Sequence, residues 1–135
     1  MDLQAMLNAL LLLEHNGRTI DKFFEDNDVK HIALYGMGLL GCRVYEHLCE
    51  TEVDVLCAFD RDADRFCEEN DIKILPPDEM LSLEKKPELI VVTSSNFYYD
   101  IKEEWEEKSG IDMISISEIL EYCIVGEDLE RVKRK

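Results

Sequence analysis

The stretch that decides the fold is His31-Ile32-Ala33-Leu34-Tyr35-Gly36-Met37-Gly38-Leu39-Leu40-Gly41. Its first five residues form a short apolar run of the length expected for a buried strand. The glycines then follow the spacing G-x-G-x-x-G. A helical pattern begins at once, with Leu40, Val44 and Leu48 on one face. A strand that turns through glycines into a helix predicts a βαβ unit of a parallel sheet.

An acidic residue follows the next predicted strand. The apolar run 53–59 is followed by Asp60, nineteen residues after Gly41. That spacing suits a carboxylate that accepts hydrogen bonds from ribose hydroxyls, while the diphosphate of a dinucleotide lies on the glycine turn and the helix N-terminus. A carboxylate repels a 2′-phosphate, so NAD(H) is favoured over NADP(H), although Arg61 could bind a phosphate or stack on adenine.

Polar residues after the fourth predicted strand are expected across the crevice from the glycine turn. Their hydroxyl and amide groups could bind a ribose, a phosphate or a nicotinamide, but capping of the next helix by Ser95 or Asn96 needs the same residue types. Both roles stay open. The predicted ligand-binding residues are Gly36, Met37, Gly38, Leu39, Leu40, Gly41, Asp60, Arg61, Thr93, Ser94 and Ser95.

Strand and helix patterns alternate along the chain. The predicted strands are 31–35, 53–59, 72–75, 88–93 and 112–116. The predicted helices before the first strand are 3–15 and 20–26, and those between or after the strands are 39–50, a helical turn at 62–69, Asp78 through Leu83, and a helix from Asn96 or Phe97 to Ser109. A last helix begins at Glu118 and is capped by Ser117. This predicts an α/β, Rossmann-like three-layer α/β/α fold with a five-stranded parallel sheet in the order 3-2-1-4-5 and an extra N-terminal helical segment. We divide the chain into a helical segment, 1–29, and a nucleotide-binding domain, 30–135.

The N-terminal segment is unusually rich in leucine. Leu3, Leu7 and Leu10 recur at helical spacing, and Leu11 and Leu12 widen the apolar face beyond one stripe. Such a face needs a cover: it either packs on the outer helices of the sheet or pairs with a second chain. We favour the second alternative, a dimerisation element.

Charge excludes several classes of partner. The 135 residues include 15 Lys or Arg and 31 Asp or Glu, giving a net charge of −16. We expect no nucleic-acid partner and no anionic membrane partner, because both require a basic surface. The apolar run 10–13 is too short to span a bilayer.

The cysteines and the acidic loop do not predict a metal site. Cys42, Cys49, Cys57, Cys67 and Cys123 form no C-x-x-C pair, which predicts reduced thiols and a cytoplasmic protein. Asp60, Asp62 and Asp64 imitate the start of a calcium loop, but Arg65 stands where glycine is required. Metal binding is therefore not expected.

One further motif resembles a catalytic pair. Tyr98 and Lys102 have the Y-x-x-x-K spacing of short-chain dehydrogenases, in which the lysine lowers the pKa of the tyrosine. Ser94 and Ser95 lie too close to Tyr98 for the serine of those enzymes. We interpret the pair as part of an ordinary helix, so no catalytic set is visible.

Four short segments carry a resemblance to a known group of proteins. They are the glycine motif 36–41, Phe59-Asp60-Arg61, Ile74-Leu75-Pro76 and Ile90-Val91-Val92-Thr93-Ser94. Together they resemble small Rossmann-like domains of bacterial polysaccharide biosynthesis, found beside glycosyltransferases and sugar-nucleotide enzymes. The resemblance covers about residues 30–120, lies at the level of the fold, and implies a glycosyltransferase or sugar-nucleotide enzyme as a partner.

Three functional hypotheses follow. The first is an accessory, homodimeric module that binds NAD(H) or a related adenine nucleotide through the glycine turn. The second is a small oxidoreductase, or the subunit of a sugar-nucleotide enzyme that a partner completes. The third is a module that binds S-adenosylmethionine, or one that binds only other proteins.

Overall fold

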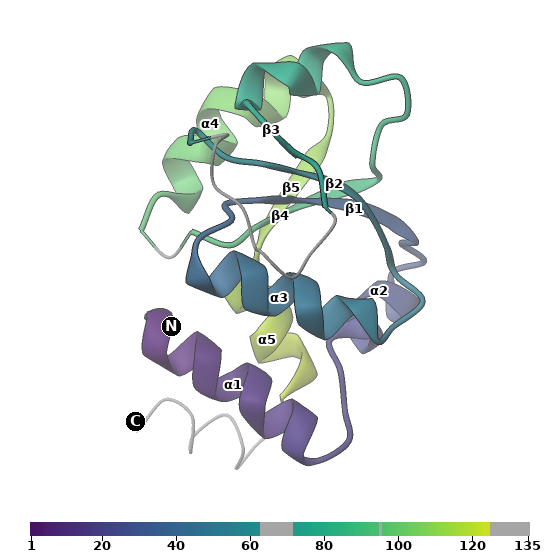
Figure 1. Cartoon of the computed structure of the whole chain (residues 1–135), viewed down its shortest axis with the longest axis vertical. Coiled ribbons are helices and arrows are strands. Elements are labelled where there is room, and N and C mark those ends of the chain that lie inside the picture. The colour runs from purple at the N-terminus through teal and green to yellow at the C-terminus, as the bar shows by residue number, and fades with distance from the viewer. Residues whose placement is uncertain (63–71, 95, 125–135) are drawn as a thin grey trace.

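The computed structural model describes residues 1–62, 72–94 and 96–124. At its centre is a parallel sheet with the strand order β3-β2-β1-β4-β5 (Figure 1). The strands are β1 His31–Tyr35, β2 Asp54–Phe59, β3 Ile74–Leu75, β4 Leu89–Val92 and β5 Asp112–Ser115. This topology confirms the predicted Rossmann-like α/β fold.

Helices cover both faces of the sheet. On one side lie α1 Leu3–His15, α2 Asp21–Asp26, α3 Leu39–Cys49 and α5 Ile116–Cys123, and on the other lie the 3₁₀ helix η1 Pro77–Ser82 and α4 Tyr98–Ser109 (Figure 1). Helix α1 contacts α3 and α5, and forms an additional outer layer on that side. The extra N-terminal helix therefore shares the core of the sheet domain.

Alternate residues of β1 enter two separate cores, because side chains alternate across a strand. Ile32 and Leu34 pack in the core beneath α1, α3 and α5. Ala33 and Tyr35 pack in the opposite core, beneath η1 and α4. Tyr35, the last residue before the glycine turn, is thus fixed on the α4 side of the sheet.

Several predicted boundaries are wrong by a few residues. The strand expected over 72–75 is reduced to Ile74–Leu75, and the helix expected from Asp78 is a 3₁₀ helix that already begins at Pro77. Helix α5 begins two residues before Glu118, and its cap is Ser115, whose hydroxyl accepts from the N–H of Ser117. The helical turn expected at 62–69 lies, apart from Asp62, outside the described residues.

One expectation about the cysteines is wrong. Cys49, Cys57 and Cys123 are free thiols, but Cys42 in the first turn of α3 is disulfide-bonded. Cys67 lies outside the described residues. The absence of a C-x-x-C pair excludes only pairs that are close in sequence, and folding brings distant residues together.

In the described part of the chain, no helix is both long and apolar enough to cross a membrane.

Candidate functional site

Two of the three glycines in the turn are required by its packing. Gly36 has φ +105°, a region that side chains disfavour, and a Cβ there would lie 2.7 Å from Thr93 Oγ1. A Cβ on Gly41 would lie 2.0 Å from the carbonyl oxygen of Gly36. Helix α3 therefore starts in direct contact with the turn that precedes it.

Gly38 is different. It is the N-cap of α3 and has φ −74° and ψ −158°, an extended conformation open to any residue. Its backbone angles therefore do not account for the glycine. A glycine here leaves main chain exposed at the point where α3 presents its first amide groups, which lack intrahelical acceptors.

Asp60 faces the glycine turn and helps to hold it. One carboxylate oxygen accepts from the Met37 N–H at 2.8 Å, and the other accepts from the Asp62 N–H at 2.8 Å. Asp60 thus combines a structural role with a position at the predicted ribose site.

The residues after β4 divide into distinct roles. Thr93 is buried, and its hydroxyl lies 2.5 Å from the Gly36 carbonyl oxygen and 3.1 Å from that of Tyr35. It positions the glycine turn from the neighbouring strand. Ser94 Oγ accepts from the Phe97 N–H at 3.3 Å, just before α4 begins. Ser95 lies outside the described residues.

A cavity of about 600 Å³ opens between the carboxyl ends of β1, β2 and β4. Its size falls within the usual range for small-molecule sites, and its place is the crevice where the strand order reverses. The predicted residues brought together in its lining are Gly36, Gly38, Leu39, Leu40, Gly41, Asp60, Arg61, Thr93 and Ser94. Met37 does not line it, because its side chain is buried in the core.

Four lining residues were missed by the sequence analysis: Leu3, Tyr35, Phe97 and Ile101. Three are apolar and come from α1, α4 and the residue before α4. The signal for Tyr35 was available, because a tyrosine at the end of a buried strand must find a partner for its hydroxyl.

Within the described residues, the Tyr35 hydroxyl has no such partner. Tyr35 is 3% exposed, and its buried oxygen makes no hydrogen bond with them. Burial raises the pKa of the phenol, and the nearby Arg61 charge offsets only part of that effect. An unsatisfied buried hydroxyl lowers the stability of the folded state by about 1–3 kcal/mol. The Tyr35 hydroxyl is therefore an unusual group in the lining of this cavity.

The pair Tyr98 and Lys102 lies away from this chemistry. The Tyr98 hydroxyl donates to the Met113 carbonyl of β5 at 3.2 Å, and Lys102 Nζ lies 3.4 Å from it. Neither residue lines the crevice. The interpretation of this motif as an ordinary helix fits the observed contacts.

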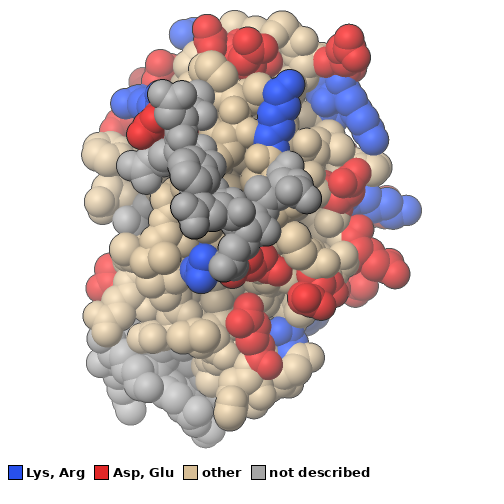
Figure 2. Space-filling model, viewed as in Figure 1, with Lys and Arg blue, Asp and Glu red and all other residues tan. Residues whose placement is uncertain are grey.

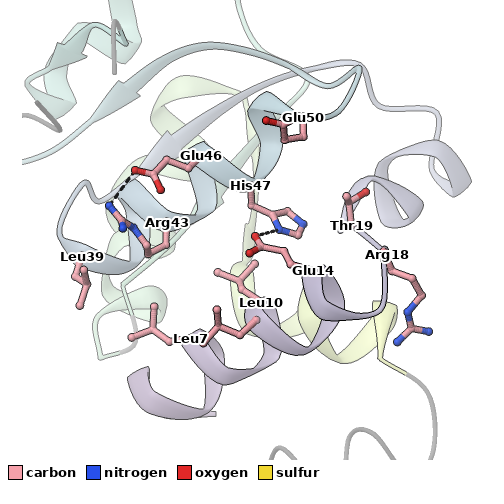
Figure 3. A pocket seen from close by; sticks show the side chains of 12 residues that line it. Leu7, Leu10, Glu14, Arg18, Thr19, Leu39, Arg43, Glu46, His47 and Glu50 are labelled. Carbon is pink, nitrogen blue, oxygen red and sulfur yellow. Dashed lines mark hydrogen bonds and ion pairs between the residues drawn. The ribbon is translucent and has the colours of Figure 1, made fainter. Parts of the chain in front are cut away.

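A second cavity, of about 660 Å³, lies between α1 and α3 (Figure 3). Its apolar lining is Leu7, Leu10, Leu11 and Leu39. At its inner end His47 Nδ1 lies 2.7 Å from Glu14 Oε2, and Nε2 accepts from the Ile20 N–H at 2.9 Å. Both ring nitrogens are therefore engaged, so this histidine is a structural link between α1, α3 and the chain before α2.

Charges of both signs lie on the surface. Figure 2 shows acidic side chains distributed over the visible face with basic ones between them. At the crevice, Arg61 forms an exposed ion pair with Glu104 at 3.4 Å. A ligand therefore meets mixed local charge within an acidic molecule.

Comparisons with known proteins give a family but no chemistry. No curated protein matches the chain. A chorismate mutase/shikimate 5-dehydrogenase fusion protein from Clostridium acetobutylicum has 13% sequence identity and a TM-score of 0.47, over 85% of this chain and 57% of that chain. This chain thus matches little more than half of that protein, and the likeness is too weak to inform function. The family model described as C2185-like, N-terminal, matches residues 28–122, and the chain belongs to this family.

Proposed function

We propose that this chain binds a nucleotide, in the first place NAD(H), in the crevice at the carboxyl ends of β1, β2 and β4. The observation that carries the proposal is Gly38. Its backbone angles do not require glycine, yet it lies on the cavity wall at the start of α3, within the same lining as Asp60. Close approach of a ligand to the main chain accounts for a glycine at this point.

The lining supplies complementary groups for such a ligand. The first-turn amides of α3 and the positive end of its dipole suit a diphosphate. Asp60 suits a ribose diol, and Ser94 and Asn96 add polar groups on the opposite wall. These groups bind and orient a nucleotide, and we assign no catalytic step to them.

Ligand titration tests this proposal. We expect NADH to bind with a measurable change in its fluorescence and to bind better than NADPH, S-adenosylmethionine or UDP-glucose. Gly38→Val should weaken binding by at least about tenfold, because the added side chain enters the diphosphate site. Glu84→Val is the control, because it introduces the same side chain at an exposed position outside the cavity, and it should leave NADH binding unchanged.

Absence of NADH binding at millimolar concentration would contradict the proposal, and so would equal binding by the Gly38→Val protein. If S-adenosylmethionine bound tightly and NADH did not, the ligand of the crevice would be S-adenosylmethionine and not a dinucleotide. Preferential binding of UDP-glucose would favour the subunit of a sugar-nucleotide enzyme, the role suggested by the sequence resemblance to domains of polysaccharide biosynthesis.

A second proposal concerns self-association through α1. Apart from the terminal His15, this helix carries one charged residue, Glu14, although 34% of the chain is charged. Leu3 and Leu11 are 42% and 63% exposed, and Leu7 lies between them at four-residue spacing. Such a row is a ridge that can pack against an identical antiparallel helix, with Leu7 beside its own copy. Because the row is uncharged, it matches a second copy better than a basic peptide.

Sedimentation or light scattering tests the dimer. Leu11→Glu should shift the protein to monomers, because a charge would be buried at the interface. Leu81→Glu is the matched control, since Leu81 is also exposed, at 53%, but lies in η1 on the other side of the sheet. Leu12, which the sequence analysis assigned to the same interface, packs partly against the core and is unsuited to this test. A wild-type monomer at high concentration would contradict the dimer.

A further inference from the structure

We infer that the Tyr35 hydroxyl reads the base of the bound nucleotide, forming a hydrogen bond to an acceptor on the nucleobase edge. The inference rests on the proposed nucleotide site. It assigns to Tyr35 a specificity for the base, which neither the glycine turn nor Asp60 provides. It also identifies the α4 side of the crevice as the base subsite.

The first observation is the isolation of this hydroxyl. Tyr35 is nearly fully buried and lines the crevice, and its oxygen makes no hydrogen bond with any residue that the structure describes. Buried hydroxyls in folded proteins are normally paired, so an unpaired one at a cavity wall needs an explanation. A ligand that brings an acceptor to it would remove the cost of leaving it unpaired.

The second observation concerns access to the hydroxyl. Arg61 lies close to it, as its effect on the phenol pKa shows. The Arg61 side chain is 69% exposed and pairs with Glu104 at 3.4 Å. Exposed pairs of this kind contribute little free energy. Rotation of Arg61 is therefore an inexpensive way for a ligand to reach Tyr35, and its planar guanidinium could then stack on the base.

The local charge favours a neutral group over an anion. Asp60 and Glu104 both act electrostatically on the Tyr35 hydroxyl, against one cation, Arg61. A phosphate brought to this point would face two carboxylates. A nucleobase is neutral, has acceptors on its edge, and avoids that repulsion.

Apolar residues of the same wall suit a flat ring. Phe97 lines the crevice and is 59% exposed, and Ile101 of α4 lines it on the side of the sheet where Tyr35 lies. An exposed aromatic ring beside an aliphatic floor is a surface on which a base can stack. The α4 side of the crevice therefore combines a stacking surface with one polar group.

The Tyr35→Phe variant tests the inference, because it removes only the hydroxyl. Calorimetry should show ADP affinity reduced by about 3- to 10-fold, the range for one neutral hydrogen bond, with pyrophosphate affinity unchanged. The ligand-free variant should melt about 2–4 °C higher, because an unpaired buried hydroxyl has been removed. Tyr99→Phe is the control, since Tyr99 is 79% exposed and does not line the crevice.

The outcomes separate the two proposals. If the wild-type protein binds neither ADP nor NADH, the nucleotide site itself is refuted. If it binds ADP and Tyr35→Phe binds ADP equally well, the base-reading role is overturned and the site stands. Equal weakening of ADP and pyrophosphate, or a lower melting temperature of the ligand-free variant, would show a structural role instead and overturn the inference.

Discussion

The three glycines of the motif differ in what the backbone requires of them. Gly36 has a positive φ, a Cβ on Gly41 would collide with a carbonyl oxygen, and Gly38 has an extended backbone that any residue can adopt. A sequence pattern treats these positions as equivalent, but substitution separates their effects.

We expect Gly41→Ala to destabilise the fold severely and Gly38→Ala to leave it nearly intact. The Cβ at position 41 would lie 2.0 Å from the Gly36 carbonyl oxygen, which is main chain and cannot move aside cheaply. The predicted loss is at least about 3 kcal/mol of unfolding free energy for Gly41→Ala and at most about 1 kcal/mol for Gly38→Ala. Urea denaturation of both variants measures the difference, and equal losses would refute this division of roles.

Glu88 predicts a pH dependence of stability. Its carboxylate accepts from the Lys30 and His31 N–H groups, both at 3.1 Å, and these bonds lower its pKa. The ionised form is thus favoured by folding. The resulting stability is present above the unfolded pKa, about 4.3, and is lost as pH falls through the lower folded value.

Glu88→Gln should therefore lower the melting temperature at pH 7, and the gap from wild type should close as the pH falls below about 4. Thermal melts between pH 7 and pH 2.5 check this, with Glu84→Gln as an exposed control. A gap that persists at the acidic end would show that the effect does not come from ionisation.

At the scale of elements, the sequence predicted the regular parts of the fold well and the short ones poorly. The apolar runs at β1, β2 and β4 and the helical spacing of α1, α3 and α4 reflect burial, which periodicity reports directly. Element η1 and strand β3 are short, and the two prolines 76 and 77 fix their geometry more than burial does. The cap of α5 was misplaced because Ser115 and Ser117 suit that role equally well in sequence.

The candidate site was only half predictable. The main-chain part, from Gly36 to Gly41 with Asp60, follows a spacing rule that encodes geometry. The apolar wall does not, because Leu3, Phe97 and Ile101 come from different elements and meet only in the fold. Strand periodicity places Tyr35 in the core, as the structure confirms. The usual need of a buried tyrosine for a hydroxyl partner pointed to this residue, but the sequence could not show that the hydroxyl makes no hydrogen bond within the described residues.

Two neighbouring leucines of α1 test how this helix is attached. Leu10 is 3% exposed and lies in the core, whereas Leu11 is 63% exposed. We expect Leu10→Ala to cost about 2–5 kcal/mol, and Leu11→Ala less than about 0.5 kcal/mol in the monomer. Chemical denaturation at low protein concentration measures both. Similar small values would mean that α1 is not part of the folded core.

At the scale of the whole molecule, the net charge of −16 acts on every anion that approaches. The crevice offers local attraction through the amides of α3 and through Arg61, but these act over short distances. The field of the surplus carboxylates reaches as far as the Debye length, about 10 Å at 0.1 M salt. Long-range repulsion and short-range attraction therefore respond differently to salt.

This difference predicts an unusual salt dependence of nucleotide association. Raising NaCl from about 20 mM to about 300 mM should speed the association of NADH by about 2- to 5-fold, since screening removes the repulsion before contact. In a protein that attracts its ligand through a basic surface, the same increase in salt would slow association. Stopped-flow fluorescence with NADH measures the rate, with potassium chloride as a second salt to exclude a specific ion effect. A rate that falls with both salts would mean that the local field of α3 and Arg61 extends beyond the crevice and outweighs the acidic surface.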